Sequence, residues 1–223
     1  MDCFLASEKF GGKCEIYRPI AIMKSQSSSN RGRPREFDEV AVLERAVLVF
    51  RERGFHGTSI TDLSAATKLS SGSLYKAFQD KRGVFIAALD HYLDARNCKI
   101  QEILEGIHSA KEKIKVLLEF YIQSSQFDEG RLGCMVVGTA IELSTHDADI
   151  RAKIGAALDR NERRLIELIQ IGQTRGEISI TVDAPSTARV VLALFQGFRV
   201  LGKSRHERAN IDGTVETAMK LLG

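Results

Sequence analysis

Apolar residues recur at helical spacing along the chain from residue 38 onward. Val40, Leu43, Val47 and Phe50 lie three or four positions apart, so they share one face of a short amphipathic helix. Gly54 is expected to end this helix, because glycine readily adopts the left-handed conformation found at helix C-termini. The pattern predicts a first helix over about residues 38 to 53.

Two shorter apolar stripes follow this helix. The second stripe comprises Ile60, Leu63 and Ala66, and the third comprises Leu74 and Phe78. Each is preceded by a residue type preferred at helix N-caps, Thr58 or Ser59 before the second and Ser70 before the third. Three short helices within about forty residues, the last two joined by a tight turn near Lys68, predict a helix-turn-helix.

Longer helices are expected after Asp80, and no segment has the alternation of a β-strand. Apolar stripes predict them near residues 85–107, 114–122, 133–144, 147–173, 185–201 and 212–222. The fold class is therefore predicted to be all-α.

The predicted elements divide the chain into three parts. Residues 1–35 are expected to be a flexible basic arm, because 24–30 is a Ser-rich polar run with too little apolar surface to order itself. Residues 36–82 form the helix-turn-helix domain, and residues 83–223 form a second helical domain. Met23 leads directly into the polar run, so one hypothesis is that translation starts there and 1–22 are not translated.

Composition excludes several classes of protein. None of the four cysteines forms a C-x-x-C pair, the five histidines are scattered, and no nucleophile elbow or phosphate-binding loop is present, so neither a metal, a cofactor nor an enzymatic activity is predicted. No apolar run is long enough to span a membrane, and no signal peptide is recognisable, which predicts a cytoplasmic protein.

Positive charge is concentrated near the predicted helix-turn-helix. The chain has a net charge of +3, yet residues 24–82 contain 11 Lys/Arg against 7 Asp/Glu. The third helix also exposes chemistry suited to a major groove. Ser71 and Ser73 offer hydroxyls, Gly72 permits close approach, Tyr75 adds a hydroxyl and a flat apolar face, and Lys76 is cationic. These features predict double-stranded DNA as a partner.

The segment from Thr58 to Phe85 resembles the tetracycline-repressor (TetR) family of bacterial transcription regulators. The residues that match the pattern of the family are Thr58, Ser70, Gly72, Leu74, Tyr75, Phe78 and Lys81. The resemblance implies a three-helix DNA-binding domain, a divergent helical ligand-binding domain, and dimerisation through the last two long helices. Two positions depart from it: Lys68 stands where the turn often has Gly, at a cost of about 1 kcal/mol if φ is positive there, and Ala77 stands where His or Tyr is common.

Together these observations predict a set of DNA contacts. The run from Arg31 to Arg35 resembles the minor-groove arm of several DNA-binding proteins, and Lys81 at a helix start suits a phosphate. The predicted DNA-binding residues are Arg31, Arg33, Arg35, Thr58, Ser59, Ser70, Ser71, Gly72, Ser73, Tyr75, Lys76 and Lys81.

The predicted function is that of a homodimeric, sequence-specific repressor that reads a pseudo-palindromic operator and is released by a small-molecule effector. Activator behaviour is the open alternative for the sign of regulation. Candidate ligand-binding residues, which mix aromatic, soft and polar groups, are Tyr121, Phe127, Met135, Thr139, Glu142 and Phe195. Candidate dimer-interface residues on the last two helices are Val191, Phe198, Val215, Met219 and Leu222.

Two alternatives in other classes remain open at this point. The chain could be a helical small-molecule-binding protein or enzyme with incidental DNA affinity, or a regulator controlled by a thiol. The second alternative points to Cys134, whose default interpretation is a small buried hydrophobic residue.

Overall fold

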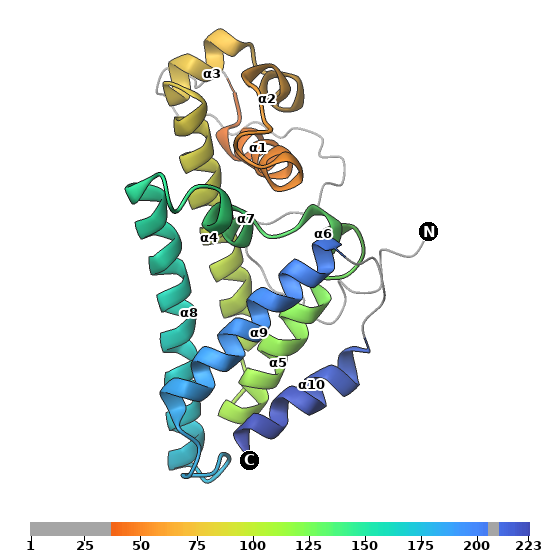
Figure 1. Cartoon of the computed structure of the whole chain (residues 1–223), viewed down its shortest axis with the longest axis vertical. Coiled ribbons are helices and arrows are strands. Elements are labelled where there is room, and N and C mark those ends of the chain that lie inside the picture. The colour runs from red at the N-terminus through yellow and green to blue at the C-terminus, as the bar shows by residue number, and fades with distance from the viewer. Residues whose placement is uncertain (1–36, 205–209) are drawn as a thin grey trace. The chain divides into compact units, whose positions relative to one another are not determined.

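A computed structural model of the chain describes residues 37–204 and 210–223. Within those ranges the regular elements are helices, which confirms the predicted all-α class. In chain order they are α1 (Glu39–Arg53), α2 (Ile60–Thr67), α3 (Ser71–Phe78), α4 (Lys81–Leu104), α5 (Ala110–Gln123), α6 (Phe127–Leu132), α7 (Met135–Glu142), α8 (Ala148–Thr174), α9 (Ala184–Ser204), α10 (Ile211–Met219) and a 3-10 turn (Lys220–Leu222). Figure 1 shows this order from orange to blue.

The chain forms two compact units, and their boundaries differ from the predicted division at residue 82. Within the described residues, the first unit holds residues 37–47 and Ser59–Ile103, whereas the second holds Leu48–Thr58, 104–204 and 210–223. Most of α4 therefore belongs with the helix-turn-helix, because its side chains complete that core. Helix α1 contributes to both units.

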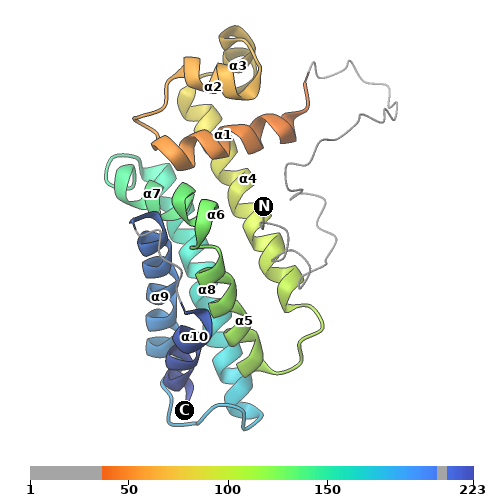
Figure 2. The same ribbon diagram turned by 90° about the vertical axis from the view of Figure 1, so that its right-hand side faces the viewer.

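The first unit is built on α1, α2, α3 and α4. Its core contains Leu63, Leu74, Val84 and Leu89, all of which are completely buried. Helices α2 and α3 pack against each other, as both ribbon views show (Figures 1 and 2). The predicted three short helices are thus observed, and the start of α4 adds the apolar surface that three helices of this length lack.

The second unit is a bundle in which α8 and α9 are the longest neighbours. Helix α5 packs against α8, α9 and α10, while α6 and α7 pack near one end of α9 (Figure 2). Ile114, Leu118, Ile169 and Ala188 are fully buried in its core.

One helix of this unit was not predicted from the sequence. The helix expected over 133–144 is observed as α7, and Gly133, whose φ is 80°, separates it from the preceding helix α6. The apolar stripe of α7 was recognisable from the sequence. The six-residue α6 was not, because FDEGRL has too few apolar positions to show a period.

Candidate nucleic-acid interface and effector region

Helix α2 begins with a reciprocal cap and ends in a left-handed residue. The Ser59 hydroxyl accepts a hydrogen bond from the Asp62 N–H at 3.1 Å, and the Asp62 carboxylate accepts one from the Ser59 N–H at 2.9 Å. At the other end Lys68 has a φ of 64°, and its N–H donates to the Ser64 carbonyl. The predicted need for a positive φ at Lys68 is confirmed, although a lysine occupies a position that favours glycine.

Helix α3 is fixed by its N-cap and by its inner face. The Ser70 hydroxyl accepts from the Ser73 N–H at 3.1 Å. Leu74 is fully buried, and the Arg45 guanidinium donates to the carbonyl of Thr67 at 3.2 Å, which ties α1 to the end of α2. The turn between α2 and α3 is therefore held on both sides.

The opposite face of α3 is open to solvent. Tyr75 is 48% exposed, Gly72, Lys76 and Ala77 are exposed, and Ser71 and Ser73 are half-buried. A side chain added at Gly72 would meet only the Ser70 hydroxyl, at 3.9 Å. This face, which no described residue of its unit covers, combines small polar groups, a hydroxylated ring and a cation, which is the chemistry a major groove accepts.

The flanking predicted contacts are less uniform. Lys81 is the first residue of α4, half-buried, and the Asp80 carboxylate caps this helix by accepting from the Gly83 N–H at 2.7 Å. Ser59 is exposed, but its hydroxyl donates a hydrogen bond to the Asp62 carboxylate at 2.6 Å. Thr58 is 1% exposed and donates its hydroxyl to the Gly54 carbonyl at 2.6 Å, so its side chain is not available to DNA in this structure. Arg31, Arg33 and Arg35 lie outside the described residues.

The six candidate ligand-binding residues have different surroundings in the second unit. Tyr121 and Phe195 stack with centroids 4.0 Å apart, and Met135 and Thr139 are buried on α7. Phe127 is 69% exposed. A pocket of about 150 Å³ lies elsewhere, against the ends of α5 and α8, and none of the six lines it.

Glu142, the remaining candidate, has a different role. Its carboxylate accepts hydrogen bonds from the backbone N–H groups of Phe55 and His56, at 2.9 and 2.6 Å. A side chain at Gly54, where φ is 74°, would lie 2.7 Å from this carboxylate. Glu142 therefore holds the turn that follows α1.

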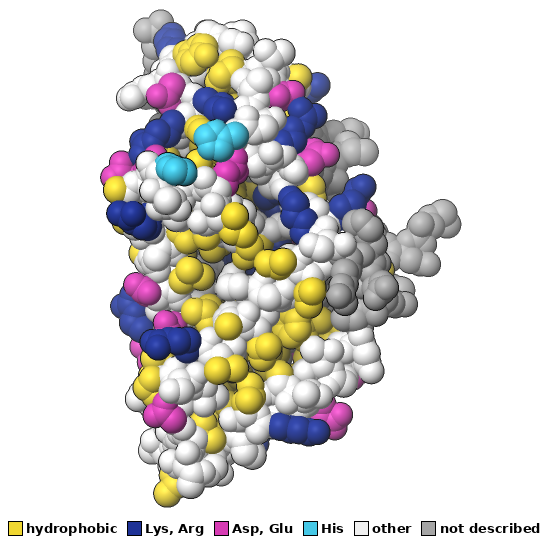
Figure 3. Space-filling model, in the orientation of Figure 1, with side chains coloured by type: hydrophobic (Ala, Val, Ile, Leu, Met, Phe, Trp, Pro, Cys, Tyr) yellow, Lys and Arg dark blue, Asp and Glu magenta, His cyan; other side chains and the backbone are white. Residues whose placement is uncertain are grey.

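The five predicted interface residues differ in how far the chain itself covers them. Val191, Val215 and Leu222 are buried inside the second unit, where they pack the bundle, and Phe198 and Met219 are half-buried. The sequence predicts that a partner covers the apolar stripes of the last two helices, because a stripe alone does not show whether the same chain already covers that face. The large exposed hydrophobic residues of α9 are Val190, Val200 and Leu201, and hydrophobic side chains gather over α9 in Figure 3.

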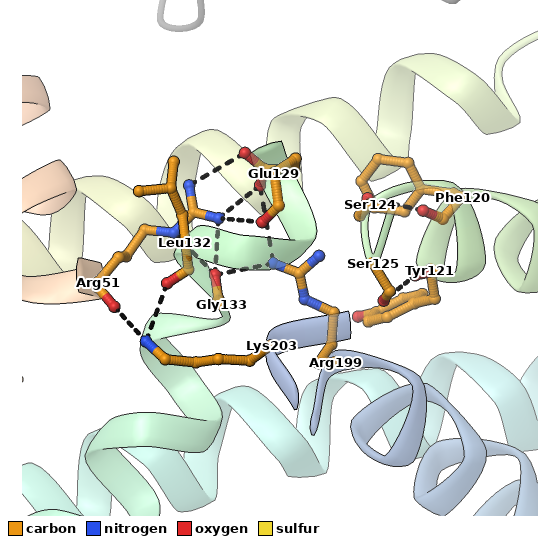
Figure 4. Close-up of polar contacts among 10 residues, drawn as sticks. All are labelled: Arg51, Phe120, Tyr121, Ser124, Ser125, Glu129, Leu132, Gly133, Arg199 and Lys203. Carbon is orange, nitrogen blue, oxygen red and sulfur yellow. Dashed lines mark hydrogen bonds and ion pairs between the residues drawn. The ribbon is translucent and has the colours of Figure 1, made fainter. Parts of the chain in front are cut away.

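A polar cluster that sequence analysis missed surrounds the carbonyl of Gly133 (Figure 4). Arg51, at the end of α1, donates to this carbonyl at 2.9 and 2.6 Å and forms an ion pair with Glu129 at 2.7 Å. Arg199 on α9 donates to the same carbonyl at 3.1 Å and lies 3.7 Å from the Glu129 carboxylate. Lys203 donates to the Arg51 carbonyl at 2.7 Å. We call Arg51, Glu129, Arg199 and Lys203 the Gly133 cluster.

Close packing of backbone makes this cluster possible. A Cβ at Gly130 or at Gly202 would collide with the Ser125 carbonyl oxygen, so only glycine lets α6 and α9 approach the backbone of Ser125 this closely. Burial, together with the charge of Arg51, lowers the pKa of the Lys203 ammonium, and Glu52 opposes this only in part. Positive charge is thus in excess around Gly133.

Other kinds of site find little support in the described ranges. No group of three potential metal-ligating side chains occurs in residues 37–204 and 210–223. The Cys134 side chain, at the start of α7, is only 9% exposed, so burial restricts access of an oxidant. Among the helices described, none is long and apolar enough to cross a membrane.

Comparison with known families gives two matches. The model described as "Bacterial regulatory proteins, tetR family" matches residues 42–88, and "Tetracyclin repressor-like, C-terminal domain" matches residues 110–217. The chain is 35% identical over 174 residues to the HTH-type transcriptional regulator YezE of Bacillus subtilis, covering 78% of this chain and 85% of that protein. It is 28% identical over 192 residues to the transcriptional repressor ComR of Escherichia coli, covering 85% of this chain and 89% of that protein.

Solved structures of transcriptional regulators also superpose on this chain. A cysteine mutant of the transcriptional regulator CifR, complexed with 26-bp operator DNA, superposes with a TM-score of 0.76 and 31% identity, over 86% of this chain and 100% of that one. A TetR transcriptional regulator from Chloroflexus aurantiacus superposes with a TM-score of 0.74 and 26% identity, over 80% of this chain and 90% of that one. FadR from Bacillus subtilis, in complex with stearoyl-CoA, shares the fold with a TM-score of 0.66 and 16% identity, over 83% of this chain and 97% of that one.

Proposed function

Because the chain belongs to the TetR family of DNA-binding transcriptional regulators, we propose that it is a repressor that binds a pseudo-palindromic operator as a homodimer and leaves it when a small-molecule effector binds. The observation that carries the proposal is the open face of α3, with Gly72, Tyr75 and Lys76 exposed on a helix whose own cap and core are complete. Footprinting of the DNA upstream of its own gene tests it. Protection of a palindrome is expected, and protection of a single asymmetric site would contradict the dimer.

DNA contacts are proposed to be of two kinds. Tyr75 and Lys76 on α3 meet base edges, whereas Lys81 and the arm residues Arg31, Arg33 and Arg35 mainly neutralise phosphates. Tyr75→Ala should weaken binding to operator by roughly 1 to 3 kcal/mol with little change for a scrambled duplex. Lys81→Ala should weaken both and reduce the salt slope by about one unit. Salt-titrated binding measures both effects, and an unchanged operator-to-scrambled ratio in Tyr75→Ala would show that α3 is not the reader.

Dimerisation is proposed to use the exposed face of α9, where Val190, Gly197, Val200 and Leu201 follow one another at helical spacing. A side chain added at Gly197 meets nothing within 4 Å in the single chain, so Gly197→Arg should fold normally and yet block a close helix pair. Sedimentation should then report monomers. Glu216→Arg, on the exposed side of α10, is the matched control and should leave the dimer intact. A dimeric Gly197→Arg protein would exclude this face.

Effector release is proposed to act by coupling through the second unit. FadR, which shares this fold, was solved with stearoyl-CoA, and here Arg51, at the end of α1, is held by Glu129 on α6. A ligand that disturbs this contact changes the end of the same helix that supports α2 and α3. Equilibrium coupling is reciprocal, so DNA must weaken effector binding by the factor by which effector weakens DNA binding, typically about 5- to 150-fold. Unequal factors would rule out this mechanism.

A further inference from the structure

The Gly133 cluster contains more positive than negative charge, and its two guanidinium groups are buried. The side chain of Arg199 is 0% exposed and that of Arg51 is 4% exposed. The carboxylate that pairs with both of them is Glu129, which is 39% exposed. Lys203 adds a third cation beside Arg51. A buried guanidinium that is not matched by its own carboxylate is unfavourable, because burial removes the water that would otherwise solvate it.

The two arginines differ in how far their donors are used. Nε, Nη1 and Nη2 of Arg51 all donate, to Gly133 and Glu129. Arg199 uses only Nη2, whereas its Nε and Nη1 are buried without a hydrogen-bond partner. Buried donors without partners are rare in folded proteins and call for an explanation such as an unfilled ligand position.

Two stacked aromatic rings lie near Arg199 in the fold. Phe195 lies one helical turn before Arg199 on α9, and its ring stacks on Tyr121 from α5 at an interplanar angle of 2°. In Figure 4 the hydroxyl end of the Tyr121 ring is turned toward Arg199. A guanidinium with free donors beside two stacked rings is suited to a molecule that has an anionic end and an apolar body.

The connection beside this region is strained. Phe127, the first residue of α6, has a φ of 51° and is 69% exposed, while its neighbour Gln126 is buried. A non-glycine residue held in the left-handed region is unfavourable and can mark a segment with a second arrangement. Such a rearrangement at the start of α6 would move Glu129, two residues further along, and open the way to Arg199.

We propose that Arg199 binds the carboxylate of the effector, an organic monocarboxylate whose apolar chain packs near Tyr121 and Phe195. This inference rests on the proposed function, since it names the chemistry of the effector. The bound carboxylate occupies Nε and Nη1 of Arg199 and repels the nearby carboxylate of Glu129. Because Glu129 also holds Arg51, the repulsion acts on the end of α1.

Titration of the full-length protein with matched probes tests the proposal. The probes are acetate, butanoate, hexanoate and octanoate, each compared with its primary amide, and binding is measured by calorimetry. We expect the carboxylates to bind more tightly as the chain lengthens, and at least about tenfold more tightly than the amides, since a charge-assisted pair is lost in the amide. Equal binding of acids and amides, or no binding by any carboxylate, would overturn the proposal. Inorganic phosphate that binds as tightly as octanoate would also overturn it, because a bare anion site needs no apolar chain.

Two variants assign the effect to this cluster. Arg199→Gln should weaken octanoate binding by about tenfold or more. Since a buried substitution can impair folding, Glu129→Gln provides an independent test of opposite sign. It removes the competing carboxylate, so octanoate should bind several-fold more tightly, whereas a merely structural role of the cluster would leave binding unchanged or weaken it. Tighter binding supports the proposal and the other two outcomes contradict it.

Different experiments can contradict the proposed function and this inference. Operator binding by the unliganded protein tests the first, and octanoate binding without DNA tests the second. A protein that binds its operator but no carboxylate keeps the regulator assignment and loses the effector class. Release of operator by octanoate in wild type, and its loss in Arg199→Gln, is the expected joint result.

Discussion

The outer face of α3 and the Gly133 cluster place their polar groups in opposite environments. On α3, Tyr75 and Lys76 face solvent while Leu74 alone fills the core, so stability and recognition belong to different residues. In the cluster, Arg51 and Arg199 are themselves interior residues, so the groups that hold α6 and α9 together are also those proposed to respond to a ligand. A substitution on α3 can therefore separate folding from binding. A substitution in the Gly133 cluster changes both folding and binding.

The largest expected effect comes from the core beneath α3. Leu74→Ala removes a fully buried side chain and should lower the free energy of unfolding by about 2 to 5 kcal/mol. Chemical denaturation followed by circular dichroism measures this loss. Tyr75→Ala, one residue further on, should change stability by less than about 0.5 kcal/mol, because this side chain is half exposed. Similar losses in the two variants would break the separation of core from surface on this helix.

The cluster is expected to show the next largest effect. Glu129→Gln removes the carboxylate from Arg51 and Arg199 and should destabilise the protein by about 2 to 3 kcal/mol, below the value for a fully buried pair because Glu129 is 39% exposed. Asp128→Asn is the matched control on the same helix. Its ion pair with Arg131 is exposed and should be worth about 0 to 1 kcal/mol. Melting curves of the two variants that coincide would show that the cluster is not energetically distinct.

A smaller effect is expected at the turn after α1. Glu142→Gln keeps an acceptor for only one of the N–H groups of Phe55 and His56, which donate to different oxygens, and it removes the negative charge, so it should cost about 1 kcal/mol. Hydrogen exchange at those two amides measures the local change, and Glu216→Gln on α10 serves as the control. Unchanged exchange would show that Glu142 does not hold this turn.

The comparison also explains what the sequence could predict. The caps at Ser59 and Ser70 and the stripe through Leu63 and Leu74 are local patterns, and the structure shows each of them. The Gly133 cluster is assembled from residues up to 152 positions apart, so no periodicity or spacing reveals it. Apolar stripes in the second unit were recognised, but Val191 and Leu222 were assigned to a partner because burial inside one chain and burial between two chains give the same pattern.

The smallest expected effect tests the one place where the local pattern of the helix-turn-helix is imperfect. Lys68 has a φ of 64°, which costs a residue with a Cβ about 1 kcal/mol relative to glycine. Lys68→Gly should therefore raise the free energy of unfolding by up to about 1 kcal/mol, less the entropy that glycine gains in the unfolded chain. Lys68→Ala is the matched control, since it removes the same charge but keeps the Cβ, and it should bring no gain. Urea denaturation of the three proteins decides between backbone strain and charge as the cause. If alanine stabilises the protein as much as glycine does, the conformation of this turn is not strained, and α2 and α3 are joined at no cost.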